Sequence, residues 1–160
     1  MKPLLLRAGG AADLAFLSEL AGQAFEEYGE YDRLLPEWAR TPGIELTVAE
    51  EDGARVGLTL LGFFEDRPRP VAIADLLAIA VDPLRRGRGL GRALLEAVVK
   101  RCRELGAVGV VSALRLTVAE TNASGRRLFE AAGFRYVPGH EGHYPRGQRA
   151  LRMELPLGPG

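Results

Sequence analysis

The sequence predicts an α/β protein in which a mixed β-sheet carries helices on both faces. Two observations support this fold class. Segments with strand and helix periodicity follow one another in the order βααβββαβαββ, and the stretch Leu76–Val81 is apolar throughout, which is typical of a strand covered on both faces. The 160 residues contain no repeat, linker or second compositional zone, so we expect a single domain over residues 1–160.

The N-terminal half predicts one strand, two helices and a β-hairpin. Leu14, Leu17 and Ala21 recur at helical spacing, and Asp52-Gly53 is a common hairpin turn pair. We interpret Trp38 as core packing against the sheet, with a place in a substrate pocket as the alternative. The expected segments are a strand over residues 4–7, helices over 12–27 and 31–40, and hairpin strands over 45–50 and 55–64.

The C-terminal half predicts a long central helix between two strands, followed by a short helix and two more strands. Asp82-Pro83 ends the strand at Val81 because proline cannot donate to a sheet. Leu90, Leu94 and Val98 then give the central helix an apolar stripe. The remaining segments are a loop over residues 65–68, a strand over 108–118, a helix over 123–132 preceded by Asn122, strands over 134–137 and 150–155, and a frayed tail over 156–160.

The loop between the apolar strand and the central helix combines three glycines with four arginines within residues 85–92. Glycines let the backbone approach a ligand closely, and the free N–H groups of a helix's first turn attract anions. A nucleotide P-loop needs a lysine that is missing here, and the G-x-G-x-x-G dinucleotide pattern fails from both Gly87 and Gly89. The loop therefore predicts a phosphate cradle of another kind.

The pattern that does match is R-x-x-G-x-G, formed by Arg86, Gly89 and Gly91. Between a strand ending in AVDP and a long helix, it resembles the acyl-CoA loop of the GNAT acetyltransferase superfamily. The resemblance implies the GNAT fold, acetyl-CoA as cosubstrate, and pairing of the backbone of Ile79, Ala80 and Val81 with the pantetheine arm. It also implies that backbone N–H groups hold the pyrophosphate from Arg86, Gly87, Arg88, Gly89, Leu90, Gly91 and Arg92.

A second stretch, NASGRRLFEAAGF, begins at Asn122 and resembles the second GNAT signature, N-x-x-A-x-x-L-Y-x-x-x-G-F. Gly125 stands where alanine is usual, which we take as a mild change. The resemblance places Asn122 and Phe129 at the cofactor. Phe129 replaces a tyrosine that in many members protonates the departing thiolate, and phenylalanine cannot donate a proton. Tyr136 and Tyr144 are therefore candidate acids.

The same resemblance leaves the base open. The branch that acetylates ribosomal-protein N-termini usually has glutamate five residues before the asparagine, where this chain has Thr117. Histone-acetylating members have a glutamate six residues before the valine that ends the central strand, and Asp75 occupies that position. Asp75 is the candidate base, working through water because its side chain is one methylene shorter. The alternative is a strand-entry residue that hydrogen-bonds to backbone.

Composition excludes several other classes. The formal net charge is zero, so no global field favours nucleic acid or a membrane surface, and no apolar run reaches the length of a membrane span. The single Cys102 cannot form an internal disulfide and is expected to pack as a small apolar residue, which leaves a cytoplasmic protein as the default. His140 and His143 lack a third ligand at sensible spacing, so we expect no metal site.

We therefore expect an acetyl-CoA-dependent N-acetyltransferase that transfers the acetyl group directly to a primary amine. The alternative is an acyl-CoA-binding sensor that has lost catalysis, which Phe129 and Thr117 would favour. The acceptor side is expected to be built by residues 28–38 and 139–147, and it leaves a small molecule, a lysine side chain and a peptide N-terminus open. A homodimer is the open alternative to a monomer, since dimers are common in the resembling family.

Overall fold

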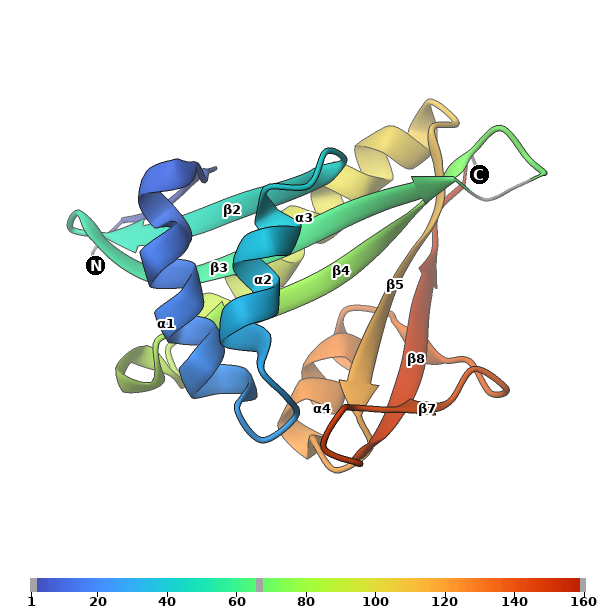
Figure 1. Ribbon diagram of the computed structural model, residues 1–160. Helices are drawn as coiled ribbons and strands as arrows, with labels where there is room; N and C mark the ends of the chain where they lie inside the picture. The colour runs from blue at the N-terminus through green and yellow to red at the C-terminus, as the bar shows by residue number, and fades with distance from the viewer. Residues whose placement is uncertain (1–2, 66–67, 159–160) are drawn as a thin grey trace.

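The computed structural model describes residues 3–65 and 68–158 as one eight-stranded mixed sheet with helices on both faces (Figure 1). The predicted element order is confirmed, with one further two-residue strand. The strands are β1 (Leu4–Ala8), β2 (Ile44–Glu51), β3 (Ala54–Glu65), β4 (Ala72–Val81), β5 (Val111–Ala119), β6 (Arg135–Tyr136), β7 (Gly142–His143) and β8 (Arg149–Pro156). The helices are α1 (Leu14–Phe25), α2 (Tyr31–Ala39), α3 (Leu90–Ala107) and α4 (Ala123–Ala131), with 3₁₀ turns at Ala11–Asp13 and Pro83–Arg85.

The strands follow the order β1-β2-β3-β4-β5-β8-β6, and β7 also pairs with β8. Among the strand pairs of the described residues, only β4 and β5 run parallel, with registered pairs from Ala72–Val111 to Leu76–Leu116. Beyond Leu76 the two strands separate, as Figure 1 shows. From there β4 pairs with β3 alone and β5 with β8 alone, so two strand edges face each other across a gap.

A β-bulge in β4 precedes this gap. The register with β3 passes from Leu61–Leu76 to Leu60–Ala78, which leaves Leu77 as an extra residue. Because side chains alternate between faces, one extra residue reverses the alternation. Leu76 packs in the core under α3, whereas Ala78 packs in the core under α1 and α2. The bulge therefore turns the end of β4 relative to the rest of the strand.

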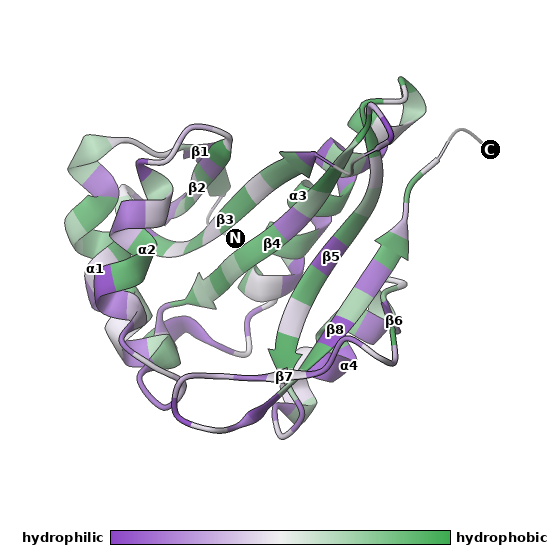
Figure 2. Cartoon of the chain, turned by 45° about the vertical axis from the view of Figure 1, so that its right-hand side comes forward, coloured by the Kyte–Doolittle hydropathy of each residue, from purple (hydrophilic) through white to green (hydrophobic). Residues whose placement is uncertain are grey.

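Each face of the sheet has its own core. Leu17, Leu20 and Leu35 of α1 and α2 pack on one face, and Leu95 and Val98 of α3 pack on the other. Figure 2 shows that the helices beside the sheet carry both apolar and polar segments. No helix of the described ranges is long and apolar enough to cross a membrane.

Several predicted boundaries differ from the structure. The strand expected at Leu76–Val81 begins at Ala72, and the strand expected over residues 108–118 begins at Val111. The expected loop over residues 65–68 includes residues 66–67, which lie outside the described residues. Of the tail predicted over residues 156–160, residues 159–160 lie outside the described residues. The prediction was wrong for Pro156, which ends β8, and for Leu157, which is buried against Gly106 and donates its N–H to the Ser112 carbonyl at 2.9 Å.

The remaining core prediction concerns Cys102, and it is confirmed. The side chain is fully buried in the core between α3 and the sheet. Burial raises the pKa of the thiol to about 11, so it stays protonated at neutral pH and packs as an apolar group.

Candidate functional site

The loop predicted to cradle phosphate lies at the open end of the gap between β4 and β5. Asp82 follows β4 and accepts a hydrogen bond from the Leu84 N–H at 3.0 Å, which caps the 3₁₀ turn. Gly87 and Gly89 both have positive φ, at 79° and 80°, and Gly89 is the N-cap of α3. A residue with a side chain would be strained at either position. The glycines thus allow the sharp entry into α3 that leaves its first N–H groups open.

Gly91 has a different role, because its backbone is ordinary helix. A Cβ added there would lie 3.9 Å from Val81 Cγ2 and 3.9 Å from Leu128 Cδ2. It would therefore point between the end of β4 and helix α4. The absence of a side chain at this position leaves the space beside Val81 and Leu128 unfilled at the start of α3.

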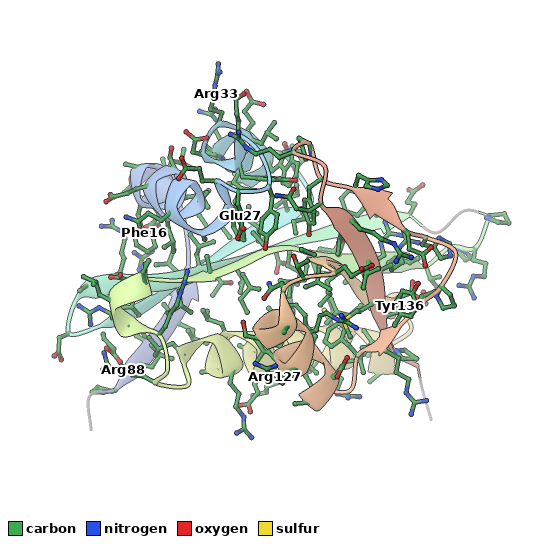
Figure 3. All side chains as sticks on the ribbon, turned by 90° about the horizontal axis from the view of Figure 1, so that it is seen from below. Phe16, Glu27, Arg33, Arg88, Arg127 and Tyr136 are labelled. Carbon is green, nitrogen blue, oxygen red and sulfur yellow. The ribbon has the colours of Figure 1, made fainter. Side chains whose placement is uncertain are left out.

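The four arginines of the loop are not equivalent. Arg85 and Arg88 each place a guanidinium nitrogen 3.2 Å from the carboxylate of Glu51, which is buried at the end of β2. Arg92 pairs with Glu96 one helical turn later, at 3.0 Å. Figure 3 shows Arg88 on this loop. Arg86 is exposed and makes no ion pair with any residue in the described part of the chain, so it is the cation left for a ligand.

A central pocket of about 340 Å³ fills the space between the separating strands and the helices above them. One wall is made by the ends of β4 and β5 together with the N-terminus of α4. The opposite wall is made by aromatic side chains of α1, α2 and the β7–β8 loop. The lining residues that the argument uses are Ile79, Thr117, Asn122 and Phe129 on the first wall, and Phe25, Tyr28, Tyr31, Trp38 and Tyr144 on the second.

Asp75 lies at the point where the strands separate. It is registered with Arg115 across the β4–β5 pair, one position before the last pair, and it lines the pocket. Arg115 Nε donates to Asp75 Oδ2 at 3.0 Å, and both side chains are about a fifth to a quarter exposed. The ion pair with Arg115 holds the carboxylate at the edge of the pocket. Asp75 therefore has a side-chain partner on the neighbouring strand, and its role as a base stays a prediction.

The two candidate acids lie in different places. Tyr144 lines the pocket, and burial together with Tyr31 and Tyr28 raises the pKa of its phenol, so the group keeps its proton at neutral pH. Tyr136 lies on β6, is 44% exposed and donates to Glu141. It is not among the residues that line the pocket, and Figure 3 shows it on the side of the molecule opposite Arg88. The structure therefore groups Tyr144, but not Tyr136, with Asp75.

Asn122 begins α4 and caps it. Its Oδ1 accepts the Gly125 N–H at 3.0 Å. A Cβ at residue 125 would lie 2.6 Å from Asn122 Nδ2, so an alanine there would push the asparagine out of this position. The glycine at residue 125 therefore leaves the room that the Asn122 side chain needs to cap α4, so this change from the usual alanine has a structural consequence. Phe129 is buried, packs against Phe134 at a ring distance of 6.0 Å and contributes to the pocket.

The segments expected on the acceptor side, residues 28–38 and 139–147, meet above the pocket. Tyr28 and Tyr144 lie with ring centroids 4.7 Å apart, and Tyr31 contacts both Tyr144 and Trp38 edge to face. Trp38 serves both interpretations, since it packs on the core under α2 and also lines the pocket. The role of Glu51 was not predicted from the sequence. Its position beside a predicted hairpin strand gives no indication of its arginine partners.

A protein-family model described as acetyltransferase (GNAT) family matches residues 14–134. The chain belongs to the GNAT acetyltransferase family. The matched region contains the bulged strand, the glycine loop, α3 and the Asn122–Phe134 segment, which are the elements that build the site.

Relatives in this family differ in what they acetylate. Mycothiol acetyltransferase of Propionibacterium freudenreichii is 34% identical over 116 residues, covering 71% of this chain and 34% of that protein. The [ribosomal protein bS18]-alanine N-acetyltransferase of Salmonella typhimurium is 41% identical over 87 residues, covering 52% of this chain and 56% of that protein. The chain thus spans about a third and about a half of the length of these relatives.

The fold is that of Arabidopsis thaliana NAA60, which is solved in complex with a bisubstrate analogue. The two structures superpose with a TM-score of 0.82 at 17% identity, over 99% of this chain and 100% of that chain. The same plant protein is also solved in complex with acetyl-CoA, the cosubstrate of this family. The loop here fits such a molecule, because it offers a helix N-terminus, the exposed guanidinium of Arg86 and a glycine in place of a side chain beside the end of β4.

Proposed function

We propose that this protein transfers the acetyl group of acetyl-CoA to a primary amine by direct attack. The observation that carries this proposal is the separation of β4 from β5 beneath the glycine loop. The free edge of Ile79, Ala80 and Val81 can pair with an extended pantetheine arm, in the way that a peptide adds to a sheet edge. The N–H groups that follow Gly89 and the guanidinium of Arg86 would hold the pyrophosphate.

In the proposed reaction the amine nitrogen forms a bond to the thioester carbon, and the carbon–sulfur bond then breaks. Acetyl-CoA supplies the acetyl group and the thiolate leaving group. The proton lost by the amine passes to Asp75 through water, and a proton from Tyr144 or from water neutralises the thiolate. Because a thiol has a reference pKa of about 8.5, the thiolate leaves without obligatory help, so Phe129 in place of tyrosine does not prevent turnover.

The alternative function is an acyl-CoA-binding module without catalysis, which the absence of a carboxylate at Thr117 and of a hydroxyl at Phe129 favours. The two proposals predict the same affinity for acetyl-CoA and differ in turnover. The test is the release of free thiol from acetyl-CoA, measured with and without a panel of amines. Amine-dependent release supports the transferase, and binding of acetyl-CoA with no release for any amine supports the binding module.

Two observations support a proposal for the class of acceptor, namely the position of the pocket and the relatives, which act on small molecules or on proteins. We propose a small-molecule or peptide amine, which would approach from the side of α1, α2 and the β7–β8 loop.

A further inference from the structure

The acceptor side of the central pocket is closed above by a contact between two loops. The Arg146 N–H donates to the Tyr28 carbonyl at 3.2 Å, and the Gln148 side chain donates to the Glu27 carbonyl. Pro145 packs over Gly29, where an added Cβ would lie 3.1 Å from the proline ring. We call this contact, between residues 27–29 and 144–148, the roof. Figure 3 shows Glu27 on the α1–α2 loop where the roof is made.

The roof partly shields the three tyrosine rings beneath it from water. Burial raises the pKa of Tyr28, Tyr31 and Tyr144, and each of these rings faces the pocket. A charge placed among them would lose much of its hydration, which is costly unless a partner of opposite charge is present. The identity of the charged side chains on the pocket wall therefore decides which acceptors can enter.

The pocket offers almost no such partners. Among the described residues that line it, Asp75 is the only carboxylate and no lysine or arginine is present. The charge of Asp75 is already matched by Arg115 at 3.0 Å. His143 lies at the exposed rim. Outside the lining residues, the exposed Glu27 carboxylate interacts with Tyr28. Among the lining residues, however, a carboxylate on the acceptor would find no cation, and a second ammonium group would find no carboxylate besides Asp75.

We infer that the acceptor is a primary amine whose remaining part is uncharged and largely apolar. This inference rests on the proposed function, because it assigns the aromatic wall to the acceptor. An amine attached to an aromatic or aliphatic body, or to an amide, satisfies the pocket's chemistry. Free amino acids and polyamines do not. A small amine and a peptide N-terminus share the required chemistry, so the probes must distinguish them.

The test uses three amines that share one aromatic skeleton and differ in the group beside the amine, together with three probes of other structure. Phenethylamine carries the amine alone, phenylalanine adds a carboxylate, and phenylalaninamide replaces that carboxylate with a neutral amide. Spermidine and L-2,4-diaminobutyric acid add further charges, and a phenylalanine-initiated pentapeptide amide represents a peptide. Dissociation constants are measured by NMR titration at one fixed pH of 8, with and without saturating CoA.

We expect phenethylamine and phenylalaninamide to bind about 100-fold more tightly than phenylalanine, spermidine and diaminobutyric acid. Equal binding of the whole set, tighter binding of any of the last three, or no binding by any amine would overturn the inference. The pentapeptide distinguishes the two candidate acceptors. Binding as tight as that of phenylalaninamide indicates a peptide N-terminus, and weaker binding indicates a small amine. A failure of CoA itself to bind would instead count against the proposed function, and the amine ranking without CoA would still decide the inference.

A pair of leucine variants provides the residue-level control. Tyr28→Leu removes a ring from the pocket wall and should weaken phenethylamine binding about 10-fold while leaving CoA affinity unchanged. Phe64→Leu makes a comparable change at a 43% exposed ring on β3, outside the pocket, and should alter neither. Equal effects of the two variants on phenethylamine would contradict the assignment of the aromatic wall to the acceptor.

Discussion

The substitution Gly91→Glu should stabilise the fold while it weakens the binding of acetyl-CoA. Gly91 is the second residue of α3, and an added Cβ meets nothing closer than 3.9 Å. Replacing a helical glycine by a better helix former contributes about 0.5–1 kcal/mol, and a carboxylate in the first turn of a helix about 0.3–1 kcal/mol more. The free energy of unfolding should rise by about 1–2 kcal/mol, which raises Tm by roughly 2–8 °C.

The same carboxylate should compete with the cosubstrate. It would occupy the positive end of the helix dipole and project between Val81 and Leu128, into the space that the pantetheine arm would occupy. At about 4 Å, each phosphate charge would be repelled by about 1 kcal/mol in water and about 4 kcal/mol at an effective dielectric of 20. The affinity for acetyl-CoA should therefore fall by a factor on the order of 10 to 1,000.

The assay combines thermal unfolding with isothermal titration of acetyl-CoA for three variants at this position. Gly91→Ala should gain stability and retain most of its affinity, because its Cβ fits at ordinary contact distance. Gly91→Gln introduces a side chain of the same size as glutamate but without the charge. It therefore separates the steric effect on acetyl-CoA affinity from the electrostatic one. Unchanged affinity in Gly91→Glu with a raised Tm would refute the assignment of this helix N-terminus to the pyrophosphate. A lowered Tm would show that the geometry at residue 91 has been misjudged.

Three further predictions follow from the charged groups. Arg86→Ala should weaken acetyl-CoA binding about 10-fold and reduce the salt dependence of that binding. Arg92→Ala is the control, because the Arg92 side chain is paired with Glu96, and it should change the affinity for acetyl-CoA in the same isothermal titration by less than about 2-fold. Asp75→Asn should flatten the acid limb of the pH–rate profile, and an unaltered profile would remove the residue as the base. Asp13→Asn should cost about 3 kcal/mol at pH 7 in urea unfolding, because Asp13 is buried between two arginines that hold its pKa below the ordinary value. That cost should persist above about pH 4 and shrink as the pH falls toward the native pKa, and a pH-independent difference would contradict the ion-pair account.

The fold could be predicted from sequence because its signals are local. Contiguous residues carry the signals for the apolar run Leu76–Val81, for its end at Asp82-Pro83 and for the apolar stripe of α3. The spacing of the loop glycines is informative because few motifs require that spacing. The bulge at Leu77 carries no such signal, since an extra residue in a strand shows itself only through the partner strand. Leu157 was misjudged for a similar reason, because its place against α3 depends on the path of β8.

The site was predicted in part. Asp75, Asn122 and Phe129 were identified through motif positions, and the structure brings them to one pocket. The sequence predicts that residues 28–38 and 139–147 share the acceptor side, but it does not predict the contacts of the roof, because Tyr28 and Tyr144 are far apart in the chain and no periodicity links them. The loop arginines differ in their partners because Arg85 and Arg88 pair with Glu51, which lies on another strand. Long-range ion pairs of this kind leave no trace in a single sequence.

The most direct test of the central claim is isothermal titration of the purified protein with acetyl-CoA, with ATP as the control. The claim is that the glycine loop and the gap between β4 and β5 together hold an acyl-CoA. It predicts binding of acetyl-CoA in the micromolar range, about −8 kcal/mol, and none of ATP at the same concentration. Absence of acetyl-CoA binding, or equal binding of ATP, would contradict the claim.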